Sequence, residues 1–301
     1  MLEPRSNRPL LDEHDRHFAR YDSRSHRKRR AILRETTADL TERYDEAHRL
    51  AARNVERWRA EREARGECLP QGVVNICQGD WGDVTQALTQ RWGIVFPVLN
   101  MANAHVAGGA YLQGTGAQEE NMFRRTDCHL ALKEDEIKPY DPCDPAFVRY
   151  QPEITDLLNG TRGRVSLDME RPRVCVRGRE DMQADDFGYR WLATEEVFPF
   201  YELKAAACDL RDGALFDPAE CARRFTALLD TLKQHGQRVA VLGAHGCGAF
   251  ANPAERVAEV YERKLSERRA DFDLITFAIH DGCNGPDNYQ PFAARFKAWR
   301  A

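Results

Sequence analysis

The chain has 301 residues, of which 42% are apolar, and a formal net charge of −4. This apolar content is enough for a full hydrophobic core, which excludes a wholly disordered protein. The nine cysteines are irregularly spaced and form no C-x-x-C motif, so a small disulfide scaffold is excluded as well. The sequence contains no apolar run long enough for a membrane-spanning helix. Cysteine usage of this kind favours a reducing compartment, and we expect a cytoplasmic protein with no membrane contact.

Charge is distributed unevenly along the chain. Residues 1–66 carry 17 Lys and Arg against 13 Asp and Glu, whereas the remainder carries 27 against 35. Within the basic segment, residues 27–30 read RKRR. Such a run can be a nuclear-localisation or nucleic-acid signal, but the acidic residues interleaved nearby favour a solvated helix face. Direct binding to nucleic acid is therefore not expected.

The N-terminal segment is predicted to be helical. Residues 10–65 contain neither glycine nor proline, and a stripe of side chains recurs at steps of three and four residues, as on the buried face of a helix. The stripe consists of Leu33, Thr37, Leu40, Tyr44, Ala47, Ala51, Val55 and Trp58. We expect one or two helices that end near Gly66, within an N-terminal extension of residues 1–68 that packs on a main domain of residues 69–301.

From Val73 onward, predicted strands alternate with predicted helices. Strands are expected at 73–77, 93–99, 173–176, 197–203, 238–242 and 273–279, and helices at 83–92, 118–132, 218–235, 253–268 and 287–299. The proline-rich segment 138–145 is expected to be irregular, and the polar, acidic segment 178–188 a mobile loop. This alternation indicates an α/β sandwich with a largely parallel sheet.

Two glycine-rich segments follow predicted strands. Residues 108–120 read GGAYLQGTGAQEE, and residues 243–250 read GAHGCGAF. Open parallel sheets bind ligands where their strands end, and backbone N–H groups beside a helix N-terminus suit a phosphate. Two such loops suit a diphosphate, although a purely structural role for the glycines is the alternative for each loop taken alone. Neither segment is a Walker loop or a dinucleotide fingerprint.

Glu119 and Glu120 directly follow the first loop. Neighbouring residues of a helix point about 100° apart, so we expect only one carboxylate to face a ligand as acid, base or hydroxyl anchor. The other would then stabilise the helix N-terminus. Spacing alone favours such a capping role for both, but the loop that precedes them favours the chemical role for one.

Taken together, the two segments resemble the signature of microbial-type poly(ADP-ribose) glycohydrolases: glycines followed by Gln-Glu-Glu, and a second loop ending in an aromatic residue. The resemblance implies an α/β fold, namely a three-layer α/β/α macrodomain with a mixed, largely parallel central sheet and an N-terminal helical extension. It also implies a glycosidic hydrolase that acts on ADP-ribose or ADP-ribosylated macromolecules and releases ADP-ribose. We expect a monomer that uses neither a cofactor nor a metal.

The resemblance assigns roles to particular residues. Glu120 would be the catalytic acid/base, and Glu119 would hold a ribose hydroxyl. The ADP-ribose site would consist of Asn100, Asn103, Gly108, Gly109, Ala110, Tyr111, Gln118, Gly243, His245, Gly246, Cys247, Gly248, Ala249 and Phe250. Ala110 stands where the third glycine is expected, and its Cβ would cost about 1 kcal/mol or more if the loop needs a positive φ there.

A single carboxyl group can serve as both the acid and the base of glycoside cleavage. A protonated carboxyl can donate to the leaving oxygen while an oxocarbenium-like sugar develops, and can then accept a proton from water. Such an acid works best in a partly dry cleft, which is where we expect Glu120.

Several alternatives remain open at the level of the sequence. Removal of single ADP-ribose units from protein side chains, and binding of ADP-ribose without cleavage, are the rival functions. A zinc site at His245 and Cys247, or at His280 and Cys283, is a weaker alternative, as is Cys247 acting as a nucleophile. Four phenylalanines are expected in the core, and one of them, Phe277, or else Tyr289, could stack on adenine. The four are Phe272, Phe277, Phe292 and Phe296.

Overall fold

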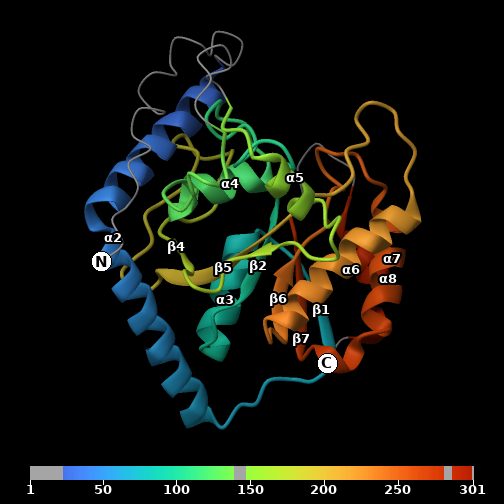
Figure 1. Ribbon diagram of the computed structural model, residues 1–301. Coiled ribbons are helices and arrows are strands. Elements are labelled where there is room, and N and C mark those ends of the chain that lie inside the picture. The colour runs from blue at the N-terminus through green and yellow to red at the C-terminus, as the bar shows by residue number, and fades with distance from the viewer. Residues whose placement is uncertain (1–22, 139–146, 281–286, 300–301) are drawn as a thin grey trace.

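The computed structural model (Figure 1) describes residues 23–138, 147–280 and 287–299. The N-terminal half contains α2 (Arg24–Arg65), β1 (Val73–Gln78), α3 (Trp81–Trp92), β2 (Pro97–Met101), α4 (Gln118–Arg125), η3 (Asp127–His129) and α5 (Pro152–Leu158). The C-terminal half contains β3 (Ser166–Leu167), β4 (Arg173–Cys175), β5 (Phe198–Ala205), α6 (Pro218–Gln234), β6 (Val239–Leu242), α7 (Ala254–Ser266), η4 (Arg269–Asp271), β7 (Leu274–Ile279), α8 (Tyr289–Arg295) and η5 (Lys297–Trp299).

The strands form one mixed sheet in the order β1-β7-β6-β2-β5-β3, with β4 also paired to β5. The five strands from β1 to β5 in this order are parallel to their neighbours, whereas β3 and β4 pair with β5 in antiparallel fashion. Because parallel strands end at the same edge of a sheet, the segments that follow the neighbouring strands β2 and β6 emerge together. The predicted mixed, largely parallel sheet is confirmed.

Helices cover both faces of the sheet, which gives the three layers. Side chains alternate between the faces along each strand: Ala240 and Leu242 of β6 join one apolar cluster, while Val239 and Val241 join the other. The first cluster contains residues of α6, α7 and α8, which Figure 1 shows together on one side of the sheet. The second contains residues of α2, α3 and α4. The predicted α/β/α fold class is therefore confirmed.

Helix α2 follows the prediction for the N-terminal segment closely. It begins after Ser23, whose hydroxyl accepts a hydrogen bond from the N–H of His26, and it ends at Gly66 with a φ of 65°. The backbone is non-helical at Arg43, so the element consists of two helical stretches. The predicted stripe is buried except for Tyr44, which is half-buried. None of the helices in the described ranges is long and apolar enough to cross a membrane.

Some predicted elements differ from the structure. The strand expected at 93–99 begins only at Pro97, because Gly93 is the left-handed cap of α3. The helix expected at 118–132 ends at Arg125, since Thr126 is extended and its hydroxyl caps the short η3. The short elements α5 and β3 were not predicted from the sequence. Most of the proline-rich segment predicted at 138–145 lies outside the described residues.

The basic run at residues 27–30 does not form the solvated face that its composition predicts. Arg30 is only 8% exposed, and Arg29 pairs with Glu180 at 2.5 Å. Lys28 donates to the carbonyl oxygen of Asp185. Lys28 and Arg29 thus contact the acidic segment 178–188, which packs against the N-terminal end of α2.

Candidate active site

The end of β2, which leads into the first glycine-rich loop, and the start of the second loop lie together at the carboxyl edge of the sheet. The N–H of Ala102 and Nε2 of His245 both lie within hydrogen-bond distance of the carbonyl oxygen of Ala205, at 2.9 and 3.0 Å. A Cβ on Gly243 would overlap the side chain of Met101, so the start of the second loop touches the end of β2. Segments more than a hundred residues apart thus border one site.

Two glycines of the first loop have backbones that only glycine adopts readily. Gly108 has a φ of 74° and Gly109 a φ of 59°, both in the left-handed region. A Cβ on Gly109 would lie 2.5 Å from Oε1 of Glu120 and 3.0 Å from Oε2 of Glu119. Both carboxylates can therefore lie against the loop only because position 109 has no side chain.

The N–H groups of residues 108–110 are used by these carboxylates and by the loop itself. Gly108 donates to Oε1 of Glu119 at 3.1 Å, and Ala110 donates to Oε1 of Glu120 at 3.0 Å. Gly109 donates to the carbonyl oxygen of Val106. In this conformation the anion held by the first loop is the carboxylate pair, whereas the sequence suggested a diphosphate.

Glu119 and Glu120 differ in what remains available to a ligand. Glu119 is 3% exposed, and its second oxygen also accepts a hydrogen bond, from the N–H of Asn103 at 2.8 Å. Burial, and then the charge of Glu120, raise the pKa of Glu119 well above its ordinary value. Glu120 is 8% exposed, and no described residue donates to its Oε2. Both side chains reach Gly109, so the expected 100° separation does not direct them to different places.

Three predicted ligand contacts are side chains engaged within the protein. Asn100 is fully buried and donates to Glu202 at 2.8 Å. Gln118 accepts from the N–H of Met101 and donates to the carbonyl of Leu99, so it joins α4 to β2. The hydroxyl of the buried Tyr111 lies 2.8 Å from Nδ1 of His129. In this geometry all three side chains hold neighbouring parts of the protein in place and do not face the ligand.

Asn103 lies at the entrance to the first loop. Its Oδ1 accepts hydrogen bonds from the N–H groups of His105 and Val106, at 2.8 and 3.0 Å. The side chain is half-buried, and its Nδ2 donates to no described residue. This amide is therefore free to donate to a ligand near Glu119.

The second loop keeps most of its N–H donors available, unlike residues 108–110 of the first. No described residue accepts a hydrogen bond from the N–H of Gly246, Gly248, Ala249 or Phe250. Gly246 has a φ of 78°, while Gly248 and Ala249 are exposed and Phe250 is half-buried. A run of unpaired N–H groups at the end of a strand forms an anion-binding concavity. This loop therefore has the donors that a diphosphate needs.

His245 and Cys247 point away from this concavity into the core. His245 bridges the carbonyl of Ala205 and the hydroxyl of Tyr261, and burial lowers its pKa to about 4. Burial also raises the pKa of the Cys247 thiol, which disfavours the thiolate that a nucleophile or zinc ligand needs. The described part of the chain has no metal-binding cluster of three or more His, Cys, Asp or Glu, and Cys283 lies outside it.

Aromatic residues near the C-terminal strand belong mostly to the core. The four phenylalanines expected there are all buried, at 4% exposure or less. Phe277 is fully buried between Phe292 and Phe296, so its face is not available for an adenine. Tyr289 is half-buried and keeps that possibility.

The helix that carries the glutamates is anchored by a pair of arginines to which the sequence assigned no role. Arg124 is fully buried, and Arg125 is 1% exposed. Arg125 pairs with Asp80 at 2.5 Å, and its guanidinium lies over the ring of Trp81. The sequence does place both arginines one turn after Glu120, on a helix whose first turn faces the loop, and this position could have indicated their role.

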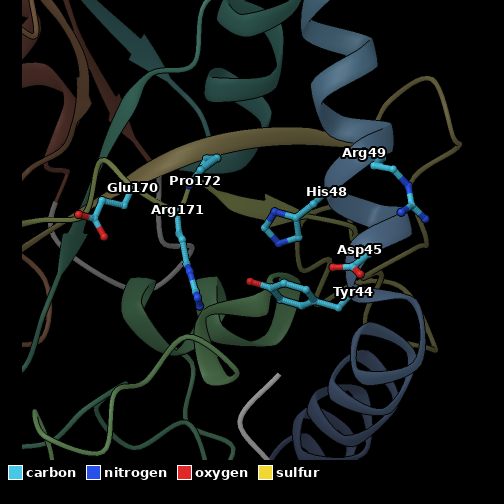
Figure 2. A pocket seen from close by; sticks show the side chains of 7 residues that line it. All are labelled: Tyr44, Asp45, His48, Arg49, Glu170, Arg171 and Pro172. Carbon is cyan, nitrogen blue, oxygen red and sulfur yellow. The ribbon is translucent and has the colours of Figure 1, made fainter. Parts of the chain in front are cut away.

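A separate cavity of about 320 Å³ lies between α2 and the segment before β4. Figure 2 shows Tyr44, His48 and Arg171 pointing into it. His48 lies 2.9 Å from the buried Asp127. The cavity shares no residue with the glutamates or the two loops. It is therefore not the candidate active site.

Comparison with known proteins supports the resemblance. Residues 22–145 match the family model described as "Microbial-type PARG, catalytic domain", PARG being poly(ADP-ribose) glycohydrolase. The structure of PARG from Thermomonospora curvata aligns over 89% of this chain and 98% of its own, with a TM-score of 0.59 and 21% identity. The same protein bound to the inhibitor ADP-HPD aligns over the same shares, with a TM-score of 0.56 and 22% identity.

A third structure, PARG from Deinococcus radiodurans in complex with ADP-ribose, aligns over 84% of this chain and 92% of its own. Its TM-score is 0.53 and its identity is 20%. No curated protein matches the chain. These structural similarities show that the chain has the macrodomain-like fold of the PARG structures.

Proposed function

We propose that the protein hydrolyses the glycosidic bond of ADP-ribose conjugates and releases ADP-ribose, with Glu120 as general acid and base. The observation that carries the proposal is the unequal use of the two carboxylates. One oxygen of Glu120 is oriented by the N–H of Ala110, while the other accepts nothing from a described residue. The match of residues 22–145 to a PARG catalytic domain supports the same reaction class.

Different groups of the site bind the diphosphate, transfer the proton and hold the ribose. The N–H groups of Gly246 and residues 248–250 bind the diphosphate, which brings the anomeric carbon of the attached ribose to Oε2 of Glu120. The protonated carboxyl of Glu120 donates to the leaving oxygen, and its carboxylate then accepts a proton from the attacking water. The amide of Asn103 holds a hydroxyl of the same ribose, while Glu119, whose two oxygens accept the N–H groups of Gly108 and Asn103, fixes the backbone around it.

Ala110 stands where the resemblance expects a third glycine. Ala110 is half-buried and lies outside the left-handed region, since the described non-glycine residues with positive φ are Phe187, Tyr189 and Ala251. Its methyl group therefore imposes no backbone strain, and the loop keeps the conformation that holds Glu120. Ala110 therefore gives no reason to set the polymer aside as the substrate, and single ADP-ribosyl groups on proteins are the second candidate.

Incubation with poly(ADP-ribose), and separately with mono-ADP-ribosylated protein, tests the proposal. The wild type should release ADP-ribose, and Glu120→Gln should lower the rate by about 100- to 10,000-fold while still binding ADP-ribose in calorimetry. A Glu120→Gln variant with the full rate would exclude the mechanism. Release from the protein conjugate alone would select the second candidate, and binding without release from either would select a reader of ADP-ribose.

Location and assembly belong to the same proposal. The seven described cysteines are free thiols, which fits a reducing compartment such as the cytoplasm. We expect the protein to act as a monomer.

A further inference from the structure

Three consecutive carbonyl groups between the glycines and the glutamates each accept a hydrogen bond from a different guanidinium group. Arg30 donates to Gln113 at 3.2 Å, Arg29 to Gly114 at 3.4 Å, and Arg124 to Thr115 at 2.7 Å. Arg29 and Arg30 belong to α2, whereas Arg124 lies on α4 beyond the glutamates. We refer to Arg29, Arg30 and Arg124 as the arginine clamp.

Glu180 supplies the counter-charge for the clamp. Its carboxylate lies 2.5 Å from Arg29 and 3.7 Å from Arg124, and it accepts a hydrogen bond from the hydroxyl of Tyr189 at 2.5 Å. Burial alone would raise the pKa of Glu180, but the hydrogen bonds from Arg29 and Tyr189 outweigh burial and lower it. The carboxylate therefore stays charged opposite the guanidinium groups at neutral pH.

The clamp lies in close contact with the loop that it holds. A Cβ on Gly114 would overlap the carbonyl oxygen of His26, and one on Gly116 would lie 2.6 Å from Nη2 of Arg29. Carbonyl groups in such a contact are shielded from water and would lose their hydrogen bonds without another donor. Gln113 and Gly114 are buried and Thr115 is half-buried, so the guanidinium groups take the place of much of the water at the 113–115 turn.

Hydrogen bonds connect the clamped turn to Glu120. Arg124 holds the carbonyl of Thr115. Thr115 in turn donates its N–H and its hydroxyl to the carbonyl of Ala110, at 3.3 and 2.9 Å. Ala110 then donates its own N–H to Oε1 of Glu120. A shift of the turn would move the donor that orients this carboxylate.

We propose that Arg29, Arg30 and Arg124 are positioning residues, which hold the 113–115 turn so that Ala110 orients Glu120, with Glu180 as their counter-ion. This inference rests on the proposed role of Glu120. It makes the N-terminal end of α2 and the acidic segment 178–188 part of the active site, although neither contributes a group that touches substrate.

Arg29→Gln and the isosteric Glu180→Gln test the clamp, and Arg57→Gln is the matched control. Arg57 lies on the same helix and pairs with Glu61 at 3.7 Å, with its side chain 45% exposed. We expect kcat for ADP-ribose release to fall about 10- to 100-fold in both clamp variants, with KM and the Kd for ADP-ribose changed less than about twofold. Arg29→Lys should recover part of the rate, since a lysine keeps the charge but not the planar fork.

A purely structural role would give a different result. Hydrogen exchange of the amides at 108–120 should accelerate in Arg29→Gln and Glu180→Gln by more than that of the β1 and β7 amides, and Arg57→Gln should match the wild type at every amide. A lowered Tm with kcat unchanged, or unaltered exchange at Ala110, would overturn the clamp. Hydrogen exchange requires no turnover, so it tests the clamp even if the wild type releases no ADP-ribose. Absence of ADP-ribose release would refute the proposed function alone.

Discussion

At the scale of single residues, Gly109 decides where the two carboxylates can lie. Its φ of 59° lies in the left-handed region, and the space where its Cβ would stand is bordered by one oxygen of each glutamate. Ala110 is different, because its backbone is outside that region. The methyl group that replaces the expected third glycine is therefore tolerated, which the sequence could not reveal without the backbone conformation.

Gly109→Ala should consequently damage the site far more than Ala110→Gly. The new Cβ displaces Oε1 of Glu120, and a displacement of this order at a reacting group costs about 100-fold in kcat/KM. Ala110→Gly should stay within about threefold of the wild type on poly(ADP-ribose) and on mono-ADP-ribosylated protein, because it relieves no strain. Steady-state kinetics of both variants check this pair, and equal effects would contradict the geometry.

Glu119 should also make stability depend on pH. Its pKa in the folded protein is raised above the ordinary value of 4.5 by burial and then by the charge of Glu120. A group with a raised folded-state pKa contributes fully below its unfolded pKa, and the contribution is lost as pH rises through the folded value.

The substitution Glu119→Gln removes that titration. Urea unfolding between about pH 4.5 and about pH 8 should therefore show the free energy of unfolding shifting in favour of the variant, relative to wild type, as pH rises. A difference that stays constant over this range would show that Glu119 is not desolvated.

At the scale of elements, predictions succeeded where the signal was local. Strands β1, β6 and β7 are short apolar runs, and each was placed within about one residue of its observed bounds. The helix expected at 118–132 was wrong because Thr126 leaves the helix to bridge Cys175 of β4, a contact that periodicity does not report. For the site, the loops and the Glu pair could be found by motif.

Other parts of the site depend on contacts that are distant in sequence. The turn conformations of the two loops determine which N–H groups are hydrogen-bonded within the protein, and these conformations cannot be predicted from the sequence. The role of the basic run follows from Glu180, which is 151 residues from Arg29. Charge patterning alone assigned that run to solvent because neither partner is visible in a local window.

The second loop gives a prediction that concerns binding. A Cβ on Gly246 would lie 2.5 Å from that of Ala207 and 2.7 Å from Nδ2 of Asn252, so Gly246→Ala should distort the loop that presents the free N–H groups. We expect the Kd for ADP-ribose to rise about tenfold, or about 1.4 kcal/mol. Gly213→Ala is the control, because Gly213 has a φ of 89° with open space around it. Equal Kd values in calorimetry would remove the loop from the site.

At the scale of the whole molecule, α2 belongs to the same core as the sheet. Leu33, Val55 and Trp58 share one apolar cluster with Phe96 and Val98. The boundary predicted at residue 68 falls in the connection between α2 and β1, and it remains a prediction. We therefore expect α2 to fold together with the main domain.

Trp58→Ala tests this shared core. Trp58 is 4% exposed, and truncating a buried tryptophan costs about 3 to 5 kcal/mol. Circular dichroism and fluorescence should give coincident urea transitions, shifted together in the variant. Leu215→Ala, at a side chain 91% exposed, should change the free energy of unfolding by less than about 0.5 kcal/mol. Loss of helix signal in a separate, earlier transition would show that α2 is an independent unit.

A crystal structure of Glu120→Gln with ADP-ribose tests the central claim most directly. We expect the diphosphate on the N–H groups of Gly246 and residues 248–250, with the anomeric carbon of the terminal ribose beside the side chain at position 120. A diphosphate bound elsewhere, for example in the cavity beside Tyr44 and Arg171, or a ribose turned away from position 120, would contradict it.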